Sequence, residues 1–357
     1  MEVEMELEKE HFSALYSCAF PAKKGAVIRA WTKMSGGWES DLFLVNLDFE
    51  EEGEQRSEEA VLKLYHGESG IQKARKESHA LQQLTQMGYP VPHLLFSSIE
   101  DLGENLEENL GESSFGRAMV AIEKIEGQVL ARVLDGSSLE EQRALMRQFC
   151  ELYVRLHALD WKELMPDLEY AHIEDVFGSW LTQALAMVDQ LLPGMFDPVI
   201  AWVQERRSEV SFERLSIIHG DFHAENLLLR DDGKLYVIDW TNVDVSDFRY
   251  DLAWSLLLLR TQGQEKLASV MLEEYERLLG HSIEDLEFFE VIACCRRLFD
   301  IAASLRYGAS TLGMRPEATT EMRGMAGHVR AVYALLQERT GCRLPEIEGL
   351  IGASYGE

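Results

Sequence analysis

Alternating apolar and polar residues dominate the first third of the chain and predict β-strands there. The predicted strands are residues 26–31, 42–47, 60–65, 94–97 and 117–125. Residues 1–20 and 73–87 have apolar positions at helical spacing, so we expect one helix in each. Residues 48–59 are too acidic to pack, and we expect a solvated hairpin loop there; residues 98–116 are polar and acidic, and we expect a loop insertion.

The pattern changes after residue 127, where apolar positions recur every three or four residues. The predicted helices are residues 137–159, 173–192, 198–209, 251–259, 265–279, 283–307 and 319–339. One stretch interrupts them. Residues 217–240, IIHGDFHAENLLLRDDGKLYVIDW, have the pattern strand, loop, strand, tight turn, strand. The sequence therefore predicts an α+β protein with a mostly β first part and a mostly helical second part.

Glu77 is a carboxylate on the apolar face of the predicted helix 73–87. It stands four and seven residues before Leu81 and Leu84, so the three side chains share one face. A charge in such a position needs a partner, because burying an unpaired charge is costly. Lys63, inside a predicted strand, could form that ion pair. The alternative is that the two residues do not pair, with Lys63 a solvated lysine of an edge strand and Glu77 a residue on the surface of the helix.

Asp221, Asn226 and Asp239 stand at the ends of short predicted strands, where side chains are held rigidly yet can face a cleft. Mg²⁺ prefers a few carboxylate or amide oxygens together with phosphate oxygens. Asn226 and Asp239 fit that role, which leaves Asp221 to accept a proton from an attacking hydroxyl. With Lys63 held against phosphates, these are the parts of a phosphoryl-transfer site.

Acidic residues outnumber basic residues by 62 to 34, which gives a net charge of −28. This balance argues against nucleic acid and anionic membranes as partners, because binding phosphates needs clustered lysine and arginine. It would attract a cationic small molecule, although solubility alone is the alternative explanation. No apolar run is long enough to cross a membrane and the acidic N-terminus is not a signal peptide, so we expect a cytoplasmic protein. The five scattered cysteines are expected to be reduced thiols.

The order of these motifs resembles the aminoglycoside phosphotransferase/choline kinase family, a small-molecule branch of the protein-kinase-like fold. The resemblance rests on a glycine-containing loop, Lys63, Glu77, HGDFHAEN at 219–226 and VIDW at 237–240. It implies a two-lobed α+β fold, with an N-terminal five-stranded antiparallel sheet plus helix and a mostly helical C-terminal lobe. The implied division is a nucleotide-binding lobe at 1–121, a hinge at 122–127 and a catalytic and substrate-binding lobe at 128–357.

The resemblance also implies roles for individual residues. Asp221 is similar to the family's catalytic base, and Asn226 and Asp239 are similar to its two Mg²⁺ ligands. Lys63 resembles the lysine that contacts the α- and β-phosphates and pairs with Glu77. Residues of the glycine loop and the hinge are expected to bind the nucleotide, and these are Gly36, Gly37, Ser40, Ile122, Glu123 and Ile125.

The acceptor-binding residues are the least defined by the sequence. The candidates are His223, Glu225, Asp244, Asp247 and Trp254. Trp254 could help to cage a quaternary ammonium group, and core packing is the alternative for this residue. Glu225 adds a negative charge where relatives often have Pro-Gly.

The predicted activity is transfer of the γ-phosphate of ATP, with Mg²⁺, to a hydroxyl of a small molecule. An aminoglycoside-like polyamine sugar fits the acidic balance, while choline, homoserine, methylthioribose or another metabolic alcohol fits the same catalytic core. The rival interpretation is a non-catalytic nucleotide-binding regulator. A protein kinase is disfavoured, because the segment between Asp239 and Asp251 is too short to form a peptide platform. The sequence does not decide whether the nucleotide is ATP or GTP. It also does not decide whether the protein is a monomer or a homodimer.

Overall fold

The structure is a computed structural model that describes residues 2–34, 36–99, 117–168 and 172–355. Most of the predicted acidic loop at 98–116 therefore lies outside the described residues. The chain forms two compact units. The first unit consists of Met1–Gly127, Tyr236–Thr241 and Gly313–Arg315. The second consists of Gln128–Leu235, Asn242–Leu312 and Pro316–Glu357.

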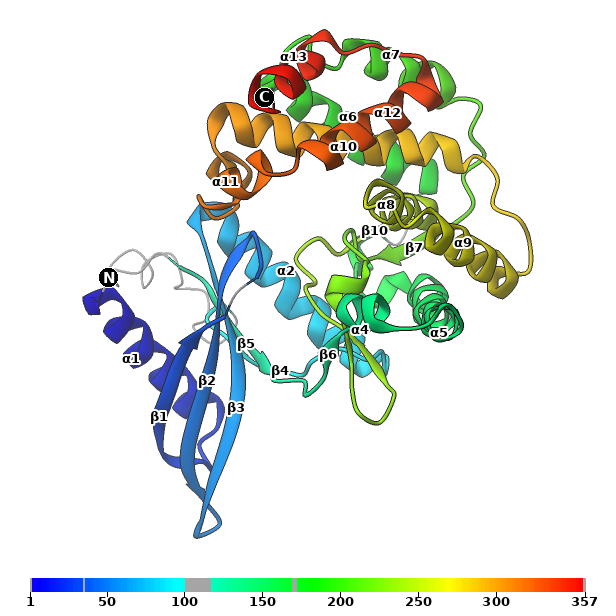
Figure 1. The fold of residues 1–357 in the computed structure, drawn as a ribbon. Helices are drawn as coiled ribbons and strands as arrows, with labels where there is room; N and C mark the ends of the chain where they lie inside the picture. Colours follow the sequence, from blue (N-terminus) through cyan, green and yellow to red (C-terminus); the bar gives the residue numbers. More distant parts are fainter. Residues whose placement is uncertain (1, 35, 100–116, 169–171, 356–357) are drawn as a thin grey trace. The chain divides into compact units, whose positions relative to one another are not determined.

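An antiparallel sheet with the strand order β1-β2-β3-β5-β4 forms the centre of the first unit (Figure 1). Its strands are β1 (Lys24–Lys33), β2 (Ser40–Glu51), β3 (Glu54–Tyr65), β4 (Leu94–Ser97) and β5 (Met119–Glu123). Each of them overlaps a predicted strand. The predicted five-stranded antiparallel sheet is therefore confirmed.

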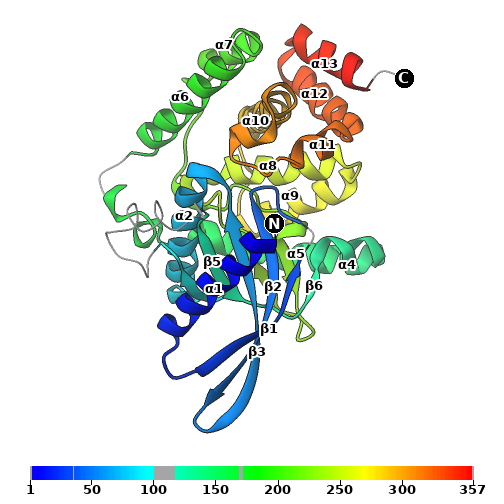
Figure 2. The same ribbon diagram turned by 90° about the vertical axis from the view of Figure 1, so that its left-hand side faces the viewer.

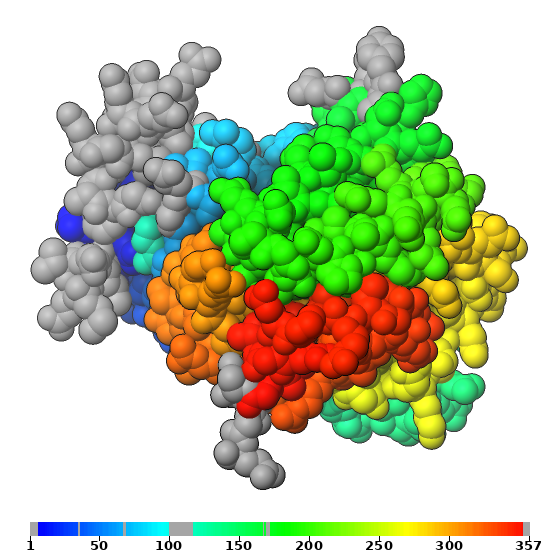
Figure 3. Space-filling model, turned by 90° about the horizontal axis from the view of Figure 1, so that it is seen from above, coloured from blue at the N-terminus to red at the C-terminus, as the bar shows by residue number. Residues whose placement is uncertain are grey.

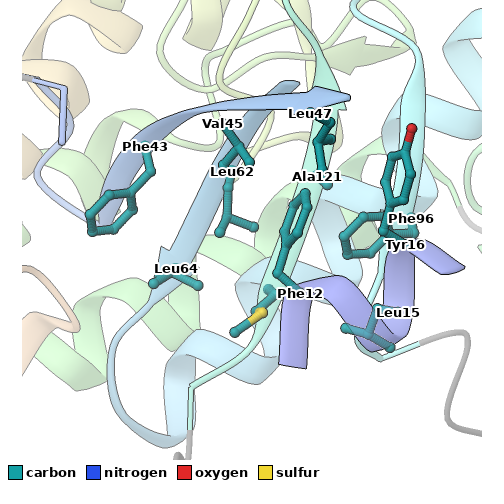
Figure 4. Close-up of a cluster of buried hydrophobic side chains, with 11 residues drawn as sticks. Phe12, Leu15, Tyr16, Phe43, Val45, Leu47, Leu62, Leu64, Phe96 and Ala121 are labelled. Carbon is teal, nitrogen blue, oxygen red and sulfur yellow. The ribbon is translucent and has the colours of Figure 1, made fainter. Parts of the chain in front are cut away.

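Helices α1 (Glu2–Ala19) and α2 (Gly67–Gln86) pack on opposite faces of this sheet. Figure 2 views α1 in front of the sheet, and Figure 4 shows Phe12 of α1 among the apolar side chains of that face, which include Leu62 of β3. Lys63, the next residue of β3, contacts α2 instead, because successive side chains of a strand point to opposite faces. The alternation of β3 thus places one lysine on the face that α2 covers.

The acidic stretch 48–59 forms the predicted hairpin, but as paired strands and not as a loop. β2 and β3 stay paired through it, and only residues 52 and 53, both with positive φ, form the turn. Phe49 is the one residue of this stretch that is buried. Asp48 accepts hydrogen bonds from Arg29 and Ser57, both at 2.6 Å. The strand pairing therefore continues through the charged residues, with Phe49 in the core and the charged side chains exposed or half-buried.

Two later pieces of chain complete the first unit. In Tyr236–Thr241, which begins within β9 (Leu235–Val237), the amide of Val237 donates to the carbonyl of Pro90 at 2.9 Å. The segment Gly313–Arg315, which we call the strap, contacts the loop between β1 and β2. The amide of Arg315 donates to the carbonyl of Trp38 at 2.6 Å.

Helices build most of the second unit. They are α4 (Leu130–Gly136), α5 (Leu139–Ala158), α6 (Ile173–Leu191), α7 (Asp197–Arg206), α8 (Phe248–Thr261), α9 (Glu265–Leu279), α10 (Leu286–Tyr307), α11 (Ala318–Arg323), α12 (Ala326–Thr340) and α13 (Pro345–Tyr355). The predicted helices all overlap these, but the short α4 and α13 are not predicted. The predicted helix 319–339 divides at Gly324 into α11 and α12, because glycine is a weak helix former.

Short strands frame a polar loop in the second unit. β7 (Leu215–Ile218) pairs with β10 (Asp244–Asp247), which the sequence does not predict, and β6 (Gln128–Val129) pairs with β8 (Leu227–Leu229). The predicted succession of strand, loop, strand, turn and strand in 217–240 is confirmed. In the turn after β8, the amide of Arg230 donates to the carbonyl of Lys234 at 2.9 Å.

Helices α8 and α10 form the core of the second unit, since nearly every residue from 248 to 258 and from 288 to 304 is buried.

In Figure 3 the surface of α6 and α7 (green) lies directly beside that of α12 and α13 (red). Cys342, between these last two helices, has its Sγ 3.4 Å from the carbonyl oxygen of Pro198 in α7. Among the residues that the structure describes, no helix combines the length and apolar composition needed to cross a bilayer.

Candidate active site

Three charged residues from distant parts of the sequence meet in the first unit. Lys63 Nζ on β3 lies 2.7 Å from Glu77 Oε1 on α2 and 2.7 Å from Asp239 Oδ1, which follows β9. Lys63 is 5% exposed and Glu77 is 1% exposed. The structure thus brings Lys63 and Glu77 together and adds Asp239 to the pair.

Glu77 has further hydrogen-bond donors around it. Its Oε1 accepts a hydrogen bond from the amide of Trp240 at 3.1 Å, and its Oε2 accepts one from the hydroxyl of Tyr65. Burial acts to lower the pKa of Lys63, but the carboxylates of Asp239 and Glu77 outweigh it and raise that pKa above its usual value. Lys63 is therefore a fixed positive charge in a rigid setting.

Asp239 has a backbone conformation that residues other than glycine rarely adopt, with φ +67°. Its Oδ1 lies 2.7 Å from Lys63 Nζ and 3.5 Å from Thr241 Oγ1, and 33% of the side chain is exposed. Such strain persists only where the surroundings hold it, and it is common at functional sites. The bond to Lys63 and the bond from the Trp240 amide to Glu77 fix this turn.

The glycine loop between β1 and β2 also depends on left-handed backbone. Gly36 and Gly37 have φ values of +119° and +73°, and a Cβ at Gly37 would lie 3.3 Å from the carbonyl oxygen of Ser40. Ser40, the first residue of β2, is buried. In the strap, Arg315 Nε donates to the carbonyl of Gly37 at 2.6 Å. The strap therefore holds the loop by its carbonyl groups.

Ile122, Glu123 and Ile125 lie at the end of β5 and directly after it. Both isoleucines are buried. The Glu123 carboxylate accepts a hydrogen bond from the amide of His93 at 3.3 Å. These residues, Lys63 and the glycine loop all belong to the first unit.

In the second unit, a buried carboxylate holds the loop between β7 and β8. Asp251 of α8 accepts hydrogen bonds from the amides of His219 at 2.7 Å and Gly220 at 2.9 Å. Gly220 has a φ of +77°, and a Cβ there would lie 2.5 Å from the carbonyl oxygen of Asn242. This position therefore requires glycine, and the backbone is fixed directly before Asp221.

The two carboxylate oxygens of Asp221 have different surroundings. Oδ1 accepts a hydrogen bond from Trp254 Nε1 at 2.7 Å and lies 3.3 Å from His223 Nε2, whereas Oδ2 lies 3.3 Å from Asn226 Nδ2. Burial acts to raise the pKa of Asp221, but His223, Arg296 and Trp254 together bring that pKa well below its usual range. Asp221 is therefore an ionised carboxylate at neutral pH.

The side chain of Asn226 is oriented by the same loop. Its Nδ2 donates to the carbonyl of Asp221 at 2.9 Å and lies 3.2 Å from His223 Nε2. The amide oxygen of Asn226 accepts no hydrogen bond from the residues that the structure describes. It is thus an oxygen atom beside Asp221 of the kind that could hold a hard cation.

Two predicted acceptor-binding residues, His223 and Glu225, line a cavity of about 90 Å³ together with residues of α5 and α8. Ligand pockets usually measure roughly 300–1,000 Å³, so this cavity does not hold a whole acceptor. Asp244 is half-buried, and its Oδ1 accepts a hydrogen bond from the amide of Val245 at 2.8 Å.

The other two predicted acceptor contacts, Asp247 and Trp254, are buried inside the second unit. Asp247 is 0% exposed, caps α8 and pairs with Arg249 Nη2 at 2.7 Å. Trp254 is 3% exposed. Neither side chain is exposed in this unit, and their roles as acceptor contacts stay predictions.

Arg296 on α10 is a residue of this site that the sequence analysis does not single out. Its Nη1 donates to the carbonyl of Gly220 at 2.7 Å, and its guanidinium carbon lies 4.1 Å from the ring centroid of Trp254. The signal for it is the pair of arginines in the apolar segment VIACCRRLF, where a charge needs a partner. The sequence does not indicate which partner, because residues 220 and 254 come from other elements.

Comparison with known protein families gives a match over most of the chain. The sequence model of the phosphotransferase enzyme family, APH, matches residues 30–287. The chain belongs to this family. The resemblance seen in its motifs is thereby confirmed.

This phosphotransferase also resembles solved structures. It superposes on a protein of Ralstonia eutropha JMP134 that is assumed to be an aminoglycoside phosphotransferase, with 16% identity, 92% of this chain, 98% of that chain and a TM-score of 0.58. The GDP complex of aminoglycoside 2'-phosphotransferase-IIIa is 17% identical, with 93% of this chain and 98% of that chain covered and a TM-score of 0.58. The ADP-bound aminoglycoside phosphotransferase APH(2'')-Ib is 17% identical, with 91% of this chain and 96% of that chain covered and a TM-score of 0.54. At these identities the likeness shows the fold, which is the kinase-like fold of this family.

Proposed function

We propose that this phosphotransferase transfers the γ-phosphoryl group of ATP, with Mg²⁺, to a hydroxyl of a small molecule. The observation that carries the proposal is the buried contact of Lys63 with both Glu77 and Asp239. A lysine held protonated between two carboxylates is a rigid cation, and phosphoryl transfer depends mainly on positioned charges of this kind. In the proposed reaction Lys63 binds the α- and β-phosphates.

Asp221 is the proposed base. As the acceptor oxygen forms its bond to the γ-phosphorus, the bond to the ADP oxygen breaks and Asp221 takes the hydroxyl proton. The low pKa of Asp221 suits a group that first orients the hydroxyl by accepting its hydrogen bond. The hydrogen bonds that the His219 and Gly220 amides donate to the Asp251 carboxylate keep Asp221 in one place.

Asn226 and Asp239 are the proposed Mg²⁺ ligands. Their donor atoms fit the ion, since one is an amide oxygen without a hydrogen bond from the described residues and the other is a partly exposed carboxylate. Bound Mg²⁺ neutralises charge on the phosphates. Lys63 also contacts Asp239, so it keeps that carboxylate in a fixed orientation.

The nucleotide is proposed to bind the first unit, between the glycine loop of Gly36, Gly37 and Ser40 and the adenine-side residues Ile122, Glu123 and Ile125. Similar solved structures are complexes with GDP, ADP or ATP, which supports a bound nucleotide and leaves both ATP and GTP to be tested. The sequence division into a nucleotide-binding lobe at 1–121, a hinge at 122–127 and an acceptor-binding lobe at 128–357 stays a prediction.

Aminoglycosides are the first acceptor class to test. Similar structures include complexes with kanamycin, gentamicin and streptomycin, and the net charge of −28 favours a polycationic acceptor. Glu225 and Asp244 carry negative charge near the loop of Asp221, and with His223 they are the predicted contacts that keep some exposure. Choline, homoserine and methylthioribose are the alternative acceptors.

The deciding experiment is a screen of Mg²⁺ and ATP with kanamycin, gentamicin, streptomycin, choline, homoserine and methylthioribose, with the phosphorylated product detected by mass spectrometry. We expect one class to gain a single phosphoryl group. The matched control is Asp221→Asn, which should lower kcat by about 10²-fold or more while ATP still binds. ATP binding without phosphorylation of any acceptor would support the regulator instead, and near-normal turnover in Asp221→Asn would contradict the assigned base.

A further inference from the structure

Two large side chains beside Asp221 are neither the proposed base nor proposed ligands of Mg²⁺ or the phosphates. Trp254, on α8, donates its indole N–H to Asp221 Oδ1 at 2.7 Å. Arg296, on α10, places its guanidinium carbon 4.1 Å from the Trp254 ring centroid. Core packing explains the burial of a tryptophan, but it does not explain why the indole N–H points at a carboxylate and the ring face at a cation.

Arg296 also holds the backbone of the loop. Its Nη1 donates to the carbonyl of Gly220 at 2.7 Å and lies 3.2 Å from the hydroxyl of Tyr250. That carbonyl belongs to the peptide unit that joins Gly220 to Asp221. Asp251 holds the amides on the other side of Gly220. A carboxylate and a guanidinium thus hold successive peptide units, and the residue that follows them is Asp221.

The contacts of Trp254 make the two oxygens of Asp221 unequal. Oδ1 has a charge-assisted hydrogen bond of 2.7 Å, whereas the described contact of Oδ2 is the longer 3.3 Å approach of Asn226 Nδ2. The indole therefore fixes the rotation of the carboxylate and leaves Oδ2 as the better acceptor for a new hydrogen bond.

We propose that Trp254 and Arg296 are positioning residues for the phosphoryl transfer. Arg296 fixes the peptide before Asp221 and supports the indole ring, and Trp254 binds Oδ1 so that Oδ2 faces the acceptor hydroxyl. This inference rests on the proposed function, in which Asp221 is the base. It also favours core packing over an ammonium cage for Trp254, since Arg296 already covers its ring.

The test compares Trp254→Phe, Arg296→Met and Arg296→Lys in the full chain. The probe is Mg²⁺–ATP with the acceptor found in the screen, or with water as acceptor if hydrolysis is the only turnover. We expect kcat to fall about tenfold or more in Trp254→Phe and Arg296→Met, because a hydrogen bond to a charged group is lost. The KM for ATP should stay within about twofold, and Arg296→Lys should keep more activity than Arg296→Met.

The chain offers a matched control pair. Arg206 lies over the ring of Trp202, 4.4 Å from its centroid, on α7 of the same unit. Trp202→Phe and Arg206→Met remove the same chemical groups away from the loop, and both should leave kcat unchanged. Equal kcat values for wild type and Trp254→Phe would overturn the inference and leave the proposed function standing.

A second measurement covers variants that lose activity through misfolding. The indole N–H resonance of Trp254, assigned by its absence in Trp254→Phe, should shift in Asp221→Asn and in Arg296→Met but not in Arg206→Met. A resonance that stays in place in the first two variants would overturn the inference. A wild-type chain that shows this resonance yet transfers phosphate to neither an acceptor nor water would instead overturn the proposed function, and the positioning roles with it.

Discussion

At the scale of single residues, the Lys63 ammonium is held by two carboxylates that lie 14 and 176 positions away in the sequence. Glu77 could be predicted as its partner, because a glutamate on an apolar helix face needs a cation. The Trp240 amide that bonds to Glu77 could not be predicted, because backbone direction after a strand depends on tertiary structure. The same limit applies to Trp254, whose burial fits core packing equally well before the position of Asp221 is known.

Glu77→Gln tests the buried network. The change keeps the shape and the hydrogen-bonding oxygen but removes one of the two charges that hold Lys63. Removing one partner of a buried ion pair usually costs about 3–5 kcal/mol, and we expect the lower end because Asp239 still pairs with Lys63. Urea unfolding should show this loss, whereas Glu10→Gln on the exposed face of α1 should not. Superimposable curves for Glu77→Gln and wild type would exclude a stabilising network.

Asp239→Ala tests the proposed metal ligand. Calorimetric titration of wild type with ATP should give a tighter Kd with Mg²⁺ than with EDTA. In Asp239→Ala we expect the difference to vanish, because the carboxylate that binds the ion is gone. Asp232→Ala, in the exposed turn after β8, is the matched control and should behave as wild type. A Mg²⁺ effect that persists in Asp239→Ala would remove this residue from the metal site.

At the scale of secondary-structure elements, helix α5 illustrates what local sequence can decide. Ser138 and Glu141 form a capping box, in which Ser138 Oγ accepts from the Glu141 amide and Glu141 Oε2 accepts from the Ser138 amide at 2.8 Å. This local signal explains why the start of α5 falls within two residues of its prediction. The paired acidic segment of β2 and β3 has no such local signal, because a net charge alone does not separate a solvated loop from an exposed strand.

Ser138→Ala should destabilise the second unit by about 1 kcal/mol, since an N-terminal backbone donor of α5 loses its acceptor. Thermal unfolding followed by circular dichroism would show a Tm a few degrees lower. The control is Ser269→Ala on α9, an exposed helix-interior serine that bonds only to the Glu265 carbonyl of its own helix. A Tm loss of equal size in both variants would mean that the capping box adds no stability.

At the scale of the whole molecule, the net charge of −28 creates a field that acts beyond any single contact. Fold class, the sheet and most helices could be predicted, because periodicity and motif order are local or sequential properties. The composition of the first unit from three chain segments could not, since nothing in the local sequence marks Gly313–Arg315 as a companion of the glycine loop.

Salt dependence tests the acceptor class through this field. For a polycationic acceptor such as kanamycin, kcat/KM should fall severalfold between about 20 and 300 mM NaCl, because screening shortens the reach of the field. A zwitterionic acceptor such as homoserine should show little change at equal ATP and Mg²⁺. A salt-independent kcat/KM for kanamycin would mean that the acidic balance does not serve acceptor capture.

The division of the first unit over three chain segments sets an order of events during synthesis. Residues 1–127 leave the ribosome long before Asp239 and Trp240, which complete the surroundings of Lys63 and Glu77. At translation rates of roughly 5–20 residues per second, that interval is on the order of ten seconds. Any sheet that residues 1–127 form during that interval has an incomplete charge network, and the strap that holds the glycine loop is made later still.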